Sequence, residues 1–176
     1  MSQSLVSSLS SLEVLAPSIL LVQDATGEYR RAHNQEVLEA AQQVLAAQIR
    51  GTDVLTSPDA VRTFLRLRMG ALPHEVFAVL HLDAKQQVIE FVEMFRGTLT
   101  QTSVYPREIL KDALRLNSCA VILVHNHPSG GGQPSSADQS LTQQLKTALN
   151  LVDVRVLDHL VVTAGAITSM AELGLV

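Results

Sequence analysis

The spacing of apolar and polar positions changes period several times along the chain. Residues 35–49 and 58–69 carry apolar side chains three and four positions apart, which predicts two amphipathic helices. Residues 74–83 are largely apolar, whereas residues 88–96 mix apolar with charged positions, and Ala84-Lys85-Gln86-Gln87 between them has the character of a turn. These two stretches therefore predict an antiparallel pair of strands.

Helices and strands alternate in the second half of the chain. A helix is predicted to begin at Tyr105-Pro106, with proline in its first turn, and to end at Asn117. The apolar run Cys119–Val124 then predicts a buried strand. The remaining predicted elements are a helix over 136–149 and strands at Val152–Leu157, at Leu160–Thr163 and around Ile167-Thr168.

This order of elements predicts an α+β fold, in which helices pack on a mixed sheet. Strand 119–124 is apolar on both of its faces, which is typical of a central strand. We therefore expect it at the centre of the sheet, next to strand 76–82.

The N-terminal 54 residues predict a smaller region of a different character. The spacing of Leu5, Leu9 and Leu12 fits a short amphipathic helix, and a frayed tail is the alternative. Ser18–Val22 predicts a strand whose hairpin partner is Glu28–Arg30. Together with helix 35–49, these elements predict a hairpin and helical region over 1–54, followed by a second domain over 55–176.

Composition and charge narrow the class of protein. The net charge of −4 gives no support to binding DNA through bulk charge, and we expect Arg62, Arg66 and Arg68 to form a solvated helix face. A single cysteine, Cys119, excludes an intrachain disulfide and suits a reducing cytoplasm. There is no basic segment typical of a secretory signal and no apolar run long enough for a membrane span. We expect a cytoplasmic protein without a membrane partner, while nucleic-acid contact and homo-oligomerisation stay open.

Two histidines separated by one residue are the first sign of a metal site in the sequence. His125 and His127 end the buried strand, and side chains two positions apart on an extended backbone point to the same side. A loop of Gly, Pro and Ser follows, and we expect it to bring Asp138 beside them. Two imidazoles and one carboxylate are a typical protein ligand set for catalytic zinc, which leaves a fourth position for water. The alternative is a plain turn in which Ser135-x-x-Asp138 is only a capping box.

The motif resembles a known family. His-x-His, seven residues, Ser135, two residues and Asp138 is similar to the JAMM (MPN+) metalloprotease signature, and HNHPSGGGQPSSAD at 125–138 resembles its RadC branch. Three further blocks agree in order: HEVFAVLHLD at 74–83, EMFRGTLTQTSVYPREILKDAL at 93–114 and LDHLVV at 157–162. The resemblance covers about residues 55–176. It implies the JAMM/MPN fold, a cytidine deaminase-like mixed sheet flanked by helices, in agreement with the pattern above.

The resemblance also implies roles for further residues. In JAMM proteins a glutamate at the start of an apolar strand, beside the histidine strand, carries the proton of the attacking water. Glu75 matches that position, while Glu93 is the rival and Glu90 a third candidate. Ser135 matches the serine that helps to stabilise the oxyanion. The usual JAMM signature has Ser or Thr between the two histidines. This chain has Asn126 there, which matches the RadC variant of the signature.

Two classes of function follow. The first is a zinc metallopeptidase or isopeptidase that hydrolyses a peptide or protein substrate with a glutamate-activated, metal-bound water. The alternative is a non-catalytic accessory protein of the RadC type, associated with DNA repair or mobile elements. The first 55 residues show no Gly-rich helix-hairpin-helix of the kind that RadC proteins commonly carry.

The remaining histidines receive no catalytic role. His159 follows Asp158, and we expect it to be a hydrogen-bonded core or edge histidine; the alternative is that this pair orients a metal-binding histidine. His33, His74 and His81 have no partner pattern in the sequence, so no function is predicted for them.

Overall fold

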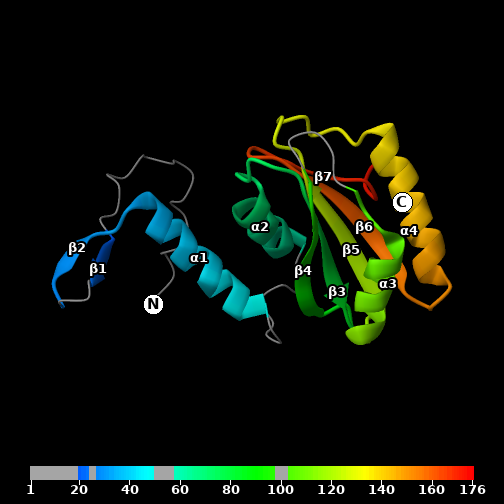
Figure 1. The fold of residues 1–176 in the computed structure, drawn as a ribbon, viewed down its shortest axis with the longest axis horizontal. Coiled ribbons are helices and arrows are strands. Elements are labelled where there is room, and N and C mark those ends of the chain that lie inside the picture. The colour runs from blue at the N-terminus through cyan, green and yellow to red at the C-terminus, as the bar shows by residue number, and fades with distance from the viewer. Residues whose placement is uncertain (1–19, 24–26, 50–57, 98–102) are drawn as a thin grey trace, which may run out of the picture. The chain divides into compact units, whose positions relative to one another are not determined.

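A computed structural model describes the chain over residues 20–23, 27–49, 58–97 and 103–176 (Figure 1). Two compact units are present, Met1–Ala41 and Gln42–Val176. The first contains β1 (Leu21–Gln23) and β2 (Tyr29–Arg31), whose antiparallel pairing confirms the predicted hairpin. The helix α1 (Asn34–Ile49) follows. The expected helix near Leu5–Leu12 lies outside the described residues.

The second unit is built on a five-stranded mixed sheet in the order β4-β3-β5-β6-β7. β3 (Val76–Leu82) is antiparallel to β4 (Val88–Arg96) on one side and to β5 (Ala120–Asn126) on the other. β6 (Arg155–Val162) runs parallel to β5, and β7 (Ile167–Ser169) is antiparallel to β6. The apolar strand β5 therefore lies at the centre beside β3, as predicted.

Helices cover both faces of this sheet (Figure 1). α2 (Pro58–Met69) packs on one face, and α3 (Pro106–Arg115) and α4 (Ser136–Asn150) pack on the other. Alternation along β3 separates two buried clusters: Ala78 belongs to the cluster on the α2 side, and Phe77 to the cluster with α3 and α4. This arrangement confirms the predicted α+β architecture. None of the helices in the described ranges is both long and apolar enough to span a membrane.

One strand differs from the prediction. The sequence predicts two strands, at 152–157 and 160–163, but the structure has the single strand β6 over this region. Its pairing with β5 shifts by one residue after Val156, so Leu157 forms a bulge. The polar Asp158 remains inside the strand because its carboxylate accepts a hydrogen bond from Ser169 Oγ at 2.6 Å. Because β6 continues through this polar stretch, the next residue, His159, is paired with Leu123 of β5.

The histidine strand is longer than predicted. β5 continues through His125 and Asn126, and His127 follows directly, with its N–H donating to the Val162 carbonyl at 2.9 Å. The connection from β5 through α4 to the parallel β6 starts at this end of the sheet. The two histidines are therefore held on a central strand next to the first turn of α4.

His81 has buried partners that the sequence did not indicate. It is 0% exposed, its Nδ1 forms a hydrogen bond with Ser118 Oγ at 2.9 Å, and its Nε2 lies 3.5 Å from Asp112 Oδ2. Ser118 precedes β5 and Asp112 lies on α3. His81 therefore ties β3 to the α3–β5 connection, at the end of β5 opposite to His125.

The buried His81 predicts a loss of stability in acid. Burial lowers the pKa of His81 to about 4, against the raising effect of Asp112 and with a further lowering by Arg115. A histidine in the unfolded chain titrates near pH 6.5, so between these values the unfolded state binds a proton that the folded state excludes. We expect His81 to lower the free energy of unfolding by up to about 3 kcal/mol as the pH falls from 6.5 to 4.

Denaturant unfolding of the wild type and of His81→Gln across this pH range measures the effect. The free energy of unfolding should fall less steeply in the variant, whatever its absolute stability at neutral pH. Parallel curves for the two proteins would contradict the prediction.

Candidate metal centre

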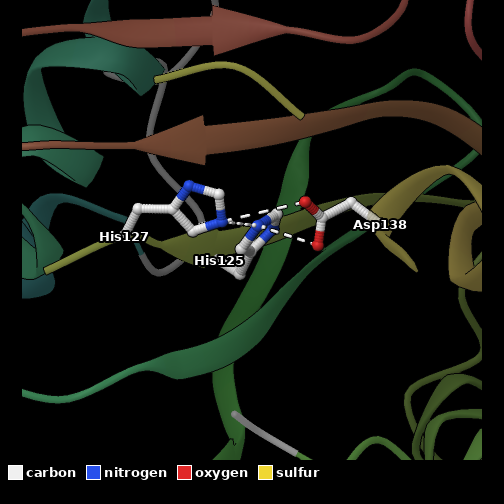
Figure 2. A group of neighbouring side chains, drawn as sticks. All are labelled: His125, His127 and Asp138. Carbon is white, nitrogen blue, oxygen red and sulfur yellow. Dashed lines mark hydrogen bonds and ion pairs between the residues drawn. The ribbon is translucent and has the colours of Figure 1, made fainter. Parts of the chain in front are cut away.

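Three side chains converge beyond the end of β5 (Figure 2). His125 Nε2 lies 2.9 Å from His127 Nε2 and 3.3 Å from Asp138 Oδ1, and His127 Nε2 lies 3.7 Å from Asp138 Oδ2. Asp138 comes from the first turn of α4, so the Gly- and Pro-containing loop does fold back to the strand. The structure thus brings together the three residues predicted as ligands.

These separations fit one tetrahedral ion. Zinc binds nitrogen and oxygen at about 2.0–2.2 Å, which places tetrahedral ligand atoms about 3.3 Å apart. The 2.9 Å between the two histidine nitrogens and the 3.3 Å from His125 Nε2 to Asp138 Oδ1 lie near that value, and the 3.7 Å from His127 Nε2 ends at the other carboxylate oxygen, Oδ2. The side chains are only 8%, 16% and 16% exposed for His125, His127 and Asp138, so solvent has limited access to their polar atoms.

A chain of buried hydrogen bonds determines which nitrogen of His125 faces this centre. Thr142 Oγ1 donates to the Asp138 carbonyl at 2.6 Å, so it accepts from His159 Nδ1, also at 2.6 Å. Neutral His159 is then an acceptor at Nε2 and receives the Nδ1 hydrogen of His125 at 2.8 Å. His125 is consequently left with a lone pair on Nε2, the nitrogen that faces His127 and Asp138.

The second histidine is fixed in the same way. His127 Nδ1 lies 2.6 Å from the Gly131 carbonyl oxygen, which can only accept, so its other nitrogen, Nε2, carries a lone pair. Two imidazole lone pairs and the Asp138 carboxylate therefore face one another without a hydrogen between them. This arrangement is repulsive by itself and is relieved by a cation at the centre, so the donor set fits a metal ion.

The protonation states favour the same arrangement. Burial raises the pKa of the Asp138 carboxyl, but His125, when it is protonated, and the hydrogen bonds from Ser135 outweigh burial, and the pKa lies well below its usual range. Burial lowers the pKa of His159 to about 3. Asp138 is therefore ionised near neutral pH, and His159 is neutral, as the hydrogen-bond chain requires.

Ser135 forms the helix cap that the sequence offered as the alternative to a metal site. Its Oγ accepts from the Asp138 N–H at 3.1 Å, and both its Oγ and its own N–H donate to Asp138 Oδ2 at 2.7 Å. Oδ1 of the same carboxylate is the oxygen nearest to His125. Oδ2, the oxygen held by the cap, also lies 3.7 Å from His127 Nε2, so the capping box and the histidine cluster share the Asp138 carboxylate, and the cap fixes it in place.

The three candidate glutamates lie in different places. Glu75 directly precedes β3, at the end of the sheet where the two histidines lie. Glu93 forms a 2.9 Å ion pair with Arg68 of α2, which places it on the face of the sheet opposite α4. Glu90 is paired across the strands with His81, at the far end of β3.

Two residues that support the site were not given this role by the sequence. His159 is a fully buried, hydrogen-bonded histidine, as predicted, and it also orients His125. Asp158 does not take part, because its carboxylate accepts from the backbone of His159 and from Ser169. Thr142 stands four residues after Asp138, and this helical spacing is the signal that could have identified it.

Thr142→Val is expected to weaken zinc binding by roughly 10- to 100-fold. Valine keeps the shape of the side chain, but it leaves His159 Nδ1 and the Asp138 carbonyl without their shared partner. Competition titration against a zinc chelator measures the change. Thr147→Val is the matched control, because Thr147 makes the same bond to the carbonyl four residues earlier on α4, at an exposed position. Equal zinc affinities in the two variants would contradict the prediction.

Known proteins are similar in sequence to most of this chain. A family model described as the RadC-like JAB domain matches residues 55–175. A UPF0758 protein of Leptothrix cholodnii is 55% identical over 159 residues, which are 90% of this chain and 72% of the relative. UPF0758 proteins of Aromatoleum aromaticum and Variovorax paradoxus are 61% and 50% identical over 150 and 164 residues, with 85% and 93% of this chain and 67% and 73% of the relatives covered.

The family match includes every element of the mixed sheet, its three covering helices and all three converging side chains. β1, β2 and α1 precede it. This chain therefore belongs to the RadC-like JAB domain family.

Proposed function

We propose that this protein is a zinc-dependent hydrolase of peptide or isopeptide bonds, with His125, His127 and Asp138 as the zinc ligands. The observation that carries the proposal is that both imidazoles turn a lone pair toward one ionised carboxylate, and that each is fixed there by a second hydrogen bond. Zinc bound to this set would lower the pKa of a water to about 7 and polarise a scissile carbonyl.

In this proposal Glu75 accepts the proton of the water and returns it to the leaving amine. The antiparallel register pairs Phe77 with His125, and continued by two residues it sets Glu75 across from His127. Side chains two apart along a strand share a face, so Glu75 continues the face of Phe77, whose ring stacks on His125 with centroids 6.5 Å apart. The positions of Glu93 and Glu90, described above, support Glu75 over both.

Ser135 is proposed as a donor to the developing oxyanion. Its hydroxyl lies 2.7 Å from Asp138 Oδ2, beside the ligand set. A neutral hydroxyl held next to the reacting carbonyl can stabilise negative charge as it forms. The same hydroxyl completes the helix cap, so this role requires it to turn from the carboxylate to the substrate.

Metal analysis followed by digestion of a peptide library tests the proposal. We expect about one zinc per chain, and cleavage of peptide or isopeptide bonds that stops on chelation and returns when zinc is added. Mass spectrometry of the products identifies the bonds that are cut. Protein that holds no zinc even after zinc is supplied would overturn the proposal. Zinc-loaded protein that cleaves neither peptide nor isopeptide substrates would favour the non-catalytic accessory role instead.

A further inference from the structure

We infer that Asn126 is a positioning residue, whose side-chain amide sets the place of Glu75 relative to the two histidines. This inference rests on the proposed function, in which Glu75 acts beside the metal. Asn126 stands between His125 and His127 on β5, and it is 1% exposed. Successive side chains of a strand leave on opposite sides, so the Asn126 amide is directed away from the two imidazoles and acts through the neighbouring strand.

The Asn126 side chain forms hydrogen bonds to the backbone on both sides of Glu75. Its Oδ1 accepts a hydrogen bond from the Val76 N–H at 2.7 Å, and its Nδ2 donates to the His74 carbonyl at 3.0 Å. Glu75 is the residue between these two groups, and its own carbonyl accepts from the Gly97 N–H at 2.9 Å. The backbone on both sides of Glu75 is therefore tied to the strand that carries the histidines.

The Asn126 side-chain amide forms hydrogen bonds to β3 just beyond the last main-chain pair between β3 and β5. The last main-chain pair between β3 and β5 is Phe77 with His125, although Val76 still pairs with β4 on its other side. Beyond that pair, the amide of Asn126 supplies one acceptor and one donor, as a peptide group of a paired strand would. Inserting a side chain between two strands separates their backbones at this point. We infer that the separation leaves the Glu75 carboxylate room to lie beside the metal.

Replacing Asn126 with alanine should remove the hydrogen bonds that hold the backbone at Glu75 to β5, without changing any of the proposed metal ligands. The Val76 N–H and the His74 carbonyl would lose their partners, and the backbone at Glu75 would no longer be held to β5. The expected consequence is a loss of the interactions that Glu75 makes at the metal, while the ligand atoms of His125, His127 and Asp138 stay in place.

Acetohydroxamate binding to the Co²⁺-substituted protein tests this without a known substrate. A hydroxamate binds a metal through its oxygens and donates a hydrogen bond to a carboxylate beside it, and the visible spectrum of Co²⁺ reports the binding. We expect Glu75→Gln to weaken binding by about tenfold, the effect of losing one hydrogen bond to a charged group. Asn126→Ala should weaken it by about three- to tenfold, and should have no further effect in the Glu75→Gln background.

Ser118→Ala is the matched control, because it removes a buried hydrogen bond to β3 at the opposite end, at His81. It should leave hydroxamate affinity unchanged although it also lowers stability. Thermal unfolding checks that each variant is folded, and Asn126→Ser, which keeps a hydroxyl acceptor, replaces Asn126→Ala if alanine prevents folding.

Each outcome decides the inference. An Asn126 effect of the same size in both backgrounds, or none in either, would overturn it and leave the zinc site standing. A Glu75→Gln variant that binds acetohydroxamate like the wild type would also overturn it, since Glu75 would then not reach the metal. Wild-type protein that binds no cobalt would overturn the proposed function, and this inference with it.

Discussion

Glu75→Gln is expected to lower kcat by roughly 100- to 10,000-fold while zinc stays bound. Glutamine keeps the size of the side chain, but it is uncharged and cannot accept a proton from the water and pass it on. Zinc affinity should hold because Glu75 is not one of the three converging ligands. Turnover of a peptide identified by the library digestion, together with metal analysis of the same sample, measures both effects.

Glu93→Gln is the matched control for this prediction. It makes the same chemical change on the opposite face of the sheet, where Glu93 forms an exposed ion pair with Arg68. Such pairs contribute about 0–1 kcal/mol to stability, so the variant should fold and turn over like the wild type. The reverse result, with Glu93→Gln inactive and Glu75→Gln active, would assign the proton transfer to Glu93. Full activity in both variants would remove the proton carrier from the proposed mechanism.

His125→Ala should abolish zinc binding at micromolar metal concentration, and Asp138→Asn should weaken it strongly. Both effects should exceed the roughly 10- to 100-fold carried by a supporting hydrogen bond, because each variant removes a ligand atom or its charge. Asparagine is used at Asp138 because it can still accept a hydrogen bond from the Ser135 N–H, so the start of α4 is kept.

Isothermal titration of the metal-free proteins with zinc measures these losses. His33→Ala is the control, since His33 is exposed and lies in the first compact unit, outside the converging set. It should bind zinc like the wild type. Retention of wild-type zinc affinity in His125→Ala would mean that the metal lies elsewhere, and the predicted ligand set would be wrong.

Much of the fold and of the ligand set could be predicted because the signals are local. The strand bounds at 88–96 follow from the run of side chains, and the convergence of His125 and His127 follows from their spacing of two. The capping box of Ser135 and Asp138 likewise depends on only four consecutive residues. Each of these features is decided within one element or one turn.

What could not be predicted depends on pairing between distant segments. The bulge at Leu157 arises from the register of β6 against β5, and without it the sequence divides β6 into two strands. The support of His125 by His159 joins residues 34 positions apart. The link from Asn126 to the backbone around Glu75 spans about 50 positions, and nothing in either segment alone indicates it. These relations appear only when the strands are placed side by side.

The capping box at the start of α4 has a consequence for how the protein would acquire the proposed zinc. Ser135 holds the Asp138 carboxylate by hydrogen bonds that exist without any ion, and two buried apolar clusters hold the sheet and its helices together. We therefore expect the chain to fold before it binds zinc, unlike a zinc finger, whose chain is unfolded until the metal arrives. If the proposed site is correct, a chelator should empty it and leave a folded protein that can be refilled, and the zinc-loaded fraction should follow the concentration of free zinc.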